Sequence, residues 1–215
     1  MEINIYALAI LLALAAGGIS SRFLAKRMGI PAVTWFYSAF FNYAAVVLVS
    51  FNMTFIMSRG TMLGFASMGG ALGLMAGLVF AEVLFRESRG RIFISWVLSA
   101  PFMFGISKLG CLYAGCCSGT FLGLPIQGVE SASFIVIYMV SLLVFFINDD
   151  KMVSVFTAMA LSFAARFFLD FFRDEHSGTV LSSAQIMTLI AGIVAAMVLG
   201  YLRIRNRGKG ELEIG

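Results

Sequence analysis

Charge is what this sequence has least of. Charged residues make up 12% of its 215 residues and hydrophobic residues 60%, whereas a soluble domain carries about 25% charged residues. The segments between its apolar runs are too short to hold a soluble domain. The composition therefore excludes a soluble protein and predicts a polytopic membrane protein whose helices contact the lipid bilayer.

Histidine, cysteine and proline are also scarce. The chain has one histidine, His176, three prolines and three cysteines, and the cysteines all lie in one short segment. An odd cysteine count leaves at least one thiol free or bound to a ligand, so these residues are not a disulfide framework. The net charge of +4 comes from basic residues at the ends of the apolar runs, so we expect no nucleic-acid partner.

Apolar runs of membrane-spanning length fill the chain. A helix needs about 20 apolar residues to cross the hydrocarbon. No basic residues precede the first run, so we interpret it as a retained span and not as a signal peptide. The pattern predicts an all-α bundle of seven spans, a single transmembrane domain over residues 1–202, and a short cytoplasmic tail at 203–215. The predicted spans are 3–21, 33–56, 61–85, 93–117, 131–147, 152–172 and 183–202.

Basic residues gather on one side of these predicted spans. Eleven lysines and arginines fall in alternate loops and in the tail, and two fall on the opposite side. The positive-inside rule places the eleven in the cytoplasm, which predicts an outside N-terminus and a cytoplasmic C-terminus. The eleven are Arg22, Lys26, Arg27, Arg86, Arg89, Arg91, Lys151, Arg203, Arg205, Arg207 and Lys209, and the two are Arg59 and Arg173.

A lysine and a glycine–cysteine segment close the fourth predicted span. Lys108 precedes residues 110–119, which read GCLYAGCCSG. A charge inside a span costs at least a few kcal/mol, so it indicates a functional site by default. The glycines permit close approach of backbone or ligand, and we expect the helix to break near Lys108. The alternative is that Lys108 snorkels to the interface. The segment predicts a ligand with negative charge.

The three thiols of this segment, Cys111, Cys116 and Cys117, allow several roles. They could bind a metal, two could form a disulfide, or they could fill small packed spaces as free thiols. Zinc sites usually combine C-x-x-C spacing with a second ligand group, and His176 lies in another loop. We therefore expect no metal and no cofactor.

Arg166, Asp170 and Arg173 recur at helical spacing in the sixth predicted span. They fall at i, i+4 and i+7, on one stripe, where Asp170 can pair with either arginine. The stripe keeps a net positive charge, and guanidinium groups match the oxygens of a phosphate. The alternative is a structural charge cluster that locks helices together.

The third predicted span carries glycines at positions 69, 73 and 77, with a further glycine at 70. This small-xxx-small spacing favours close packing of two helices. The alternative is a smooth groove wall that accommodates a lipid.

Residues 125–130, PIQGVE, open the fifth predicted span. Proline suits the first turn of a helix. Glu130 is in position to complement the helix N-terminus or to orient an arginine.

In this order, the motifs resemble those of the prolipoprotein diacylglyceryl transferase family. Residues 107–119, SKLGCLYAGCCSG, are similar to a cysteine-containing form of the family's central motif. Residues 125–130 look like the family's P-x-Q-L-Y-E, residues 166–173 look like R-F-x-x-E-x-x-R, and residues 181–185 look like L-S-x-x-Q. The likeness covers most of the chain from about residue 65 onward.

The resemblance implies an enzyme of the bacterial cytoplasmic (plasma) membrane. Such an enzyme moves a diacylglyceryl group from phosphatidylglycerol to the thiol of a lipobox cysteine in a preprolipoprotein, and glycerol 1-phosphate leaves. It implies catalytic roles for Lys108 and Arg166, whose charges serve the leaving phosphate. The implied substrate-binding residues are Gly69, Gly70, Lys108, Gly110, Cys111, Gly115, Cys116, Gly119, Gln127, Glu130, Arg166, Asp170 and Arg173.

Three positions depart from the family's pattern. Met68 replaces the histidine of the family's H-G-G motif, and methionine cannot take a proton. Lys108 replaces an arginine, keeping the charge but losing the bidentate fork, and Cys111 replaces an asparagine. His176 is a candidate substitute base. The alternatives are a catalytically divergent relative that binds anionic phospholipid or modifies another acceptor, and a small transporter or flippase.

Overall fold

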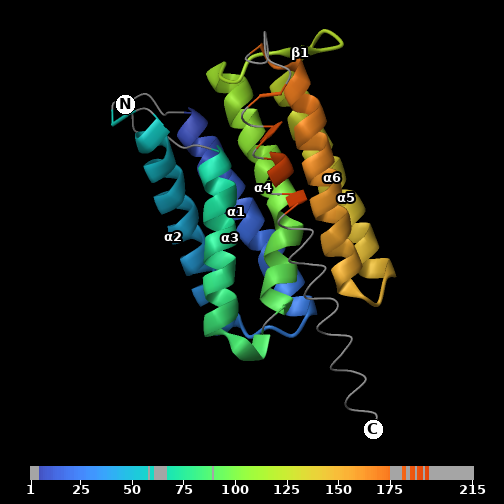
Figure 1. Ribbon diagram of the computed structural model, residues 1–215. Helices are drawn as coiled ribbons and strands as arrows, with labels where there is room; N and C mark the ends of the chain where they lie inside the picture. Colours follow the sequence, from blue (N-terminus) through green and yellow to red (C-terminus); the bar gives the residue numbers. More distant parts are fainter. Residues whose placement is uncertain are drawn as a thin grey trace.

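The computed structural model shows a bundle of long helices lying side by side (Figure 1). It describes residues 5–57, 59–60, 67–88, 90–174, 181–182, 185–186, 188–190 and 192–193. The helices are α1 (Ile5–Arg27), α2 (Ala32–Met57), α3 (Ser67–Leu84), η1 (Arg86–Ser88), α4 (Arg91–Ala114), α5 (Ile126–Ile147), α6 (Lys151–Leu169) and η2 (Asp170–Phe172). Between α4 and α5 lies a two-stranded antiparallel sheet, β1 (Thr120–Phe121) and β2 (Leu124–Pro125).

Five of these helices are long and apolar enough to cross a membrane: α1, α2, α4, α5, and α6 extended by η2. They confirm the all-α prediction, and their length and composition are typical of a multi-pass membrane protein. Helix α3 is apolar but shorter. The predicted seventh span, 183–202, and the tail at 203–215 lie largely outside the described residues. The count of seven spans and the orientation stay predictions.

Two helix ends differ from the expected ones. Helix α1 continues to Arg27, so the basic residues expected in the first loop lie on the helix itself. Helix α4 does not break near Lys108, contrary to our expectation, but continues to Ala114 and ends at Gly115. The physical reason is that Lys108 has a buried carboxylate partner, Glu130, so its charge is compensated without irregular backbone.

The connections between helices lie at the two ends of the bundle. The α1–α2 turn, η1 and the α5–α6 turn lie at one end, and the small sheet lies at the other (Figure 1). Arg91 Nη1 donates a hydrogen bond of 3.1 Å to the Met28 carbonyl, which ties the start of α4 to the α1–α2 turn. The α1–α2, α3–α4 and α5–α6 connections thus share one end of the bundle, and the side of the membrane on which they lie stays a prediction.

The glycine face of α3 packs against α2. A Cβ atom at Gly69 would lie 2.6 Å from Ser50 Cα, and one at Gly73 would lie 2.6 Å from Val46 Cα. These distances leave no room for any side chain, so the packing interpretation of the glycine spacing is confirmed for this pair of helices. Lipid binding by Gly69 and Gly70 stays a prediction.

Serine hydroxyls join the helices inside the bundle. Ser20 Oγ forms hydrogen bonds of 2.9 Å with Ser99 Oγ and 2.8 Å with Tyr138 Oη, linking α1 to α4 and α5. Trp35 Nε1 donates to Ser21 Oγ at 3.1 Å, linking α2 to α1. Each such bond between membrane helices contributes on average about 0.6 kcal/mol. This serine network holds α1, α2, α4 and α5 together, and the hydrophobic pattern did not predict it.

The close α2–α3 contact predicts that Gly73→Ala destabilises the protein by about 1–3 kcal/mol, the usual cost of overpacking. Gly128→Ala is the matched control, because its new Cβ would meet no atom closer than 3.9 Å. Both variants replace a helical glycine, so both gain the same helix propensity of about 1 kcal/mol. In detergent, Gly73→Ala should melt below Gly128→Ala; an equal or higher melting temperature would contradict the packing.

Candidate functional site

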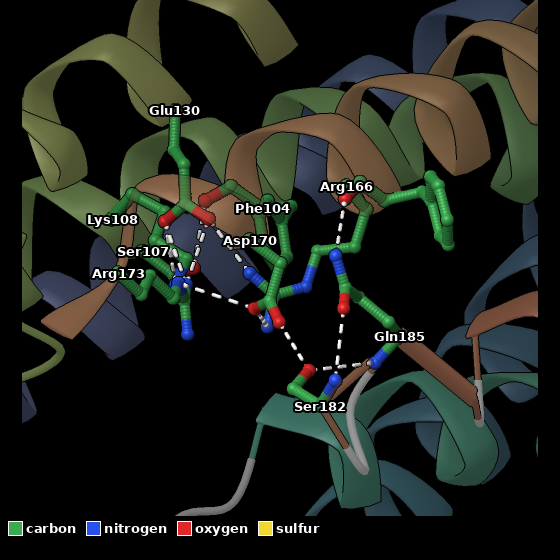
Figure 2. Close-up of polar contacts among 10 residues, drawn as sticks. Phe104, Ser107, Lys108, Glu130, Arg166, Asp170, Arg173, Ser182 and Gln185 are labelled. Atoms are coloured by element: carbon green, nitrogen blue, oxygen red, sulfur yellow. Dashed lines mark hydrogen bonds and ion pairs between the residues drawn. The ribbon is translucent and has the colours of Figure 1, made fainter. Parts of the chain in front are cut away.

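A buried carboxylate, Glu130 on α5, collects three cations from other parts of the chain. Lys108 Nζ on α4 lies 3.0 Å from Glu130 Oε2, and Arg166 Nη1 on α6 lies 2.7 Å from Oε1. Arg173, just after η2, donates from Nη2 to both carboxylate oxygens at 2.7 and 2.9 Å (Figure 2). Glu130 is 0% exposed. One side chain thus joins α4, α5 and the end of α6.

A second carboxylate, Asp170, lies between the two arginines. Its Oδ1 is 3.6 Å from Arg166 Nη2 and 3.5 Å from Arg173 Nε. Its Oδ2 accepts a hydrogen bond from Ser182 Oγ. The predicted stripe of Arg166, Asp170 and Arg173 is therefore present. It is not one continuous α-helix, because Asp170 begins η2, and Arg173, just after η2, has extended backbone.

Ser182 and Gln185 bring the next segment of the chain to this cluster. The Ser182 amide donates to Gln185 Oε1 at 2.9 Å, and the Gln185 amide donates to Ser182 Oγ at 3.1 Å. This reciprocal pair is a capping box, the usual start of a helix. Gln185 Nε2 also donates to the Phe167 carbonyl at 3.2 Å, so the cap is fixed to α6 (Figure 2).

The cluster has one more positive than negative charge. Lys108, Arg166 and Arg173 supply three positive charges, and Glu130 and Asp170 supply two negative charges. Lys108 is 2% exposed, whereas the side chain of Arg166 is 16% exposed. The ion pairs fit the hypothesis of a lock between helices. The surplus charge and the more open position of Arg166 fit the hypothesis of an anion site.

The ring of Phe104 borders the same cluster from α4. Lys108 Nζ lies 5.0 Å and Arg166 Cζ 6.0 Å from the ring centroid (Figure 2). Cations at this range are stabilised by the aromatic face, by about 2 kcal/mol or more when water is excluded. Phe104 is therefore a further contributor to the site, although no sequence pattern distinguishes it from the other phenylalanines.

The glycine–cysteine segment turns back from the end of α4 toward this cluster. Gly115, at φ 66°, ends the helix: its amide approaches the Leu112 carbonyl, and the Cys116 amide donates to the Cys111 carbonyl at 3.2 Å. This pair of bonds is a Schellman motif, which glycine favours because it tolerates positive φ. Gln127 Nε2 donates to the Cys116 carbonyl at 2.8 Å. On α5, Gln127 thus holds the loop, and Glu130, one turn later, holds the cations.

Gly119 brings the end of the segment against Arg173. The two residues form an isolated antiparallel bridge, and the Asp174 amide donates to the Ser118 carbonyl at 3.1 Å. A Cβ at Gly119 would overlap the Phe172 carbonyl and lie 2.8 Å from Arg173 Cα. Glycine is therefore required at this position for the loop to reach Arg173.

Most of the predicted site residues meet in this region. Gly110 is an exception, since a Cβ there would lie 2.6 Å from Ala9 Cβ, so it serves the packing of α4 on α1. The side chain of Met68 and all of His176 lie outside the described residues. The residues brought together are Lys108, Cys111, Gly115, Cys116, Gly119, Gln127, Glu130, Arg166, Asp170 and Arg173.

Protein-family models, curated proteins and solved structures were all compared with this chain, and none matches it. The family resemblance of the motifs therefore stays a prediction.

The loop thiols are in different electrostatic states. Cys117 accepts a hydrogen bond from the Cys111 thiol and lies near the positive charges of Lys108 and Arg173, which together lower the pKa of Cys117 to about 5. Burial, by contrast, raises the pKa of Cys116. Two adjacent cysteines therefore differ in charge at neutral pH, because a thiolate next to cations is favoured and a desolvated thiolate is not.

This difference predicts the pH dependence of thiol alkylation. Since its pKa is depressed, Cys117 loses its thiolate only as the pH falls through about 5, so its alkylation rate should be flat between about pH 6.5 and 9. Cys116 is the internal control, and its rate should climb over that range. Iodoacetamide labelling followed by site-resolved mass spectrometry measures both. A tenfold rise per pH unit at Cys117, as for an ordinary thiol with a pKa of about 8.5, would contradict the assignment.

Proposed function

We propose that this chain is a diacylglyceryl transferase-like membrane enzyme of the bacterial plasma membrane. Its donor is phosphatidylglycerol, and its acceptor is the lipobox cysteine thiol of a preprolipoprotein. Arg166 and Lys108 act on the donor's phosphate, with Arg173 beside them, and Glu130 and Asp170 orient the three cations. The proposal is supported by the order and spacing of the four motifs and by the charge of the cluster.

The observation that carries the proposal is the single surplus positive charge at Glu130. Three buried or half-buried cations face two carboxylates, so these five side chains carry one net positive charge. The Cys117 thiolate lies near Lys108 and Arg173, and an anionic ligand would share the cluster with it. A phosphodiester carries one negative charge, and guanidinium donors match its oxygens. Arg166 has the most exposed side chain of the three cations and is best placed to meet a ligand.

The chemistry requires charge stabilisation at the leaving group. The acceptor thiolate attacks the glyceryl carbon of the donor, a carbon–sulfur bond forms, and the carbon–oxygen bond to the phosphate breaks. The electron pair goes to the leaving glycerol 1-phosphate, whose charge grows in the transition state. Cations already fixed by Glu130 and Asp170 need no reorganisation at that moment, and such preorganised donors accelerate a reaction the most.

Activation of the acceptor thiol is assigned to the cationic field. Met68 cannot serve as a base, and positive charges near a thiol lower its pKa by a unit or more. A general base typically contributes about 10²–10⁴-fold. A transferase that relies on the field alone is therefore expected to be slower than one with a histidine base.

The second candidate function is binding of anionic phospholipid without transfer. One feature favours it: methionine stands at the position of the family's histidine, so the chain lacks that candidate base. Under this reading the same cluster holds the same phosphodiester, but no group activates a thiol.

A transfer assay tests the proposal directly. Purified protein, phosphatidylglycerol labelled in its diacylglyceryl group and a lipobox peptide should give lipidated peptide and glycerol phosphate. Arg166→Gln should lower the rate at least about 100-fold, the usual cost of removing a donor from a developing charge. Arg86→Gln is the matched control, because Arg86 is an exposed arginine in η1 at the opposite end of the bundle.

The outcomes separate the two candidates. If no peptide is lipidated but the protein retains phosphatidylglycerol in an Arg166-dependent way, the chain is an anionic-lipid binder and not a transferase. If both Arg166→Gln and Lys108→Met retain the lipid normally, the cluster is a lock between helices and both proposals are wrong.

A further inference from the structure

Three sulfur atoms meet at the end of α4. The Sγ atoms of Cys111, Cys116 and Cys117 all lie within 4.8 Å of one another, and all three thiols are free. Cys111 is buried in the last turn of the helix, and the other two are half-buried in the loop that follows. The transfer reaction proposed above does not use these three thiols.

The backbone is shaped to bring these sulfurs together. The Schellman turn at Gly115 reverses the chain, so that Cys116 Sγ approaches the Cys111 carbonyl at 3.8 Å. Cys117 then takes a positive φ of 56°, which costs a non-glycine residue about 1–3 kcal/mol and is found where the surroundings enforce it. The Gln127 hydrogen bond to the Cys116 carbonyl and the bridge between Gly119 and Arg173 hold the loop on either side of Cys117.

The size of the group suits a three-coordinate metal. With a metal–sulfur distance of about 2.3 Å, as zinc thiolates have, three ligands around one ion lie about 4 Å apart. The observed separations, all within 4.8 Å, are close to this value. In the part of the chain that the structure describes, no histidine or carboxylate joins the group.

The donors select the kind of ion. Structural zinc sites take four protein ligands in a tetrahedron, and three sulfurs do not complete one. Thiolates alone favour a soft ion such as Cu(I). Three thiolates around a monovalent ion leave two negative charges, and the positive charges of Lys108 and Arg173 act on these sulfurs. These two cations also pair with Glu130, so the sulfur group and the charge cluster draw on the same positive charges.

We propose that Cys111, Cys116 and Cys117 form a three-sulfur binding site for a soft monovalent metal ion, Cu(I). Binding forms three metal–sulfur bonds, displaces the protons that the thiols still carry, and changes no oxidation state. The expectation from the sequence was no metal, because the spacing is not C-x-x-C. The Schellman turn makes that spacing unnecessary, because it brings Cys116 and Cys117 close to Cys111, which lies five and six positions earlier in the sequence. The site does not depend on the proposed transferase activity.

A competition experiment tests the site. Full-length protein in detergent, reduced and kept free of oxygen, is titrated with Cu(I) in the presence of the chromophoric chelator bicinchoninate. One Cu(I) per chain should be withheld from the chelator, with a new ultraviolet absorption from sulfur-to-copper charge transfer. Cys111→Ser, Cys116→Ser and Cys117→Ser should each lose both signals. Ser118→Ala, a change at an exposed neighbour in the same loop, should keep them.

Other results would overturn the proposal. They are no copper withheld, equal uptake by the triple serine variant, or stoichiometric zinc that copper does not displace. One free thiol on denaturation of the reduced, oxygen-free protein used for the titration would also overturn it, because two sulfurs would then be held in a disulfide. The variant Arg166→Gln distinguishes failure of the copper site from failure of the proposed function. This variant should lose lipid transfer and still bind one Cu(I).

Discussion

The structure depends on one buried negative charge, that of Glu130. An isolated carboxylate or ammonium in an apolar interior is too costly to persist, and pairing with hydrogen-bonded partners makes it tolerable. Glu130 contacts Lys108, Arg166 and Arg173 within 3.0 Å, so α4, α5 and α6 have to meet at this point. The same pairing lets α4 run past Lys108 without a break, which in turn places Gly115 and the cysteines beyond the end of the helix.

The loop after α4 is built onto this charge cluster. Gly119 pairs with Arg173 through the backbone while the guanidinium of Arg173 binds Glu130. Gln127, one turn before Glu130, holds the Cys116 carbonyl. The anion site proposed for lipid and the sulfur site proposed for copper therefore share their supports and the positive charges of Lys108 and Arg173. The atoms that would bind the ligand differ: cationic side chains in one case and thiols in the other.

The sequence was sufficient for the class of protein and for the separate motifs. Hydrophobic run lengths predicted the long helices, and helical spacing predicted the stripe of Arg166, Asp170 and Arg173 and the glycine face of α3. It could not predict that Glu130 would take three cations, because these come from distant positions and pairing depends on packing. The thiol cluster was missed for a related reason, since a turn at Gly115 decides it. The cap formed by Ser182 and Gln185 could have been found, because S-x-x-Q is a capping-box pattern.

The central role of Glu130 is tested most directly by comparing melting temperatures. The proteins compared are the wild type, Glu130→Gln and the double variant Glu130→Gln/Lys108→Met. Breaking a buried ion cluster by removing one partner costs about 3–5 kcal/mol, since the charges left behind are uncompensated. For a chain of this length that corresponds to a fall of at least about 6 °C in melting temperature. The second substitution removes one stranded cation and should restore part of the loss. Two results would contradict the central role of Glu130. One is a Glu130→Gln protein with the melting temperature of the wild type, and the other is a double variant that is less stable than the single variant.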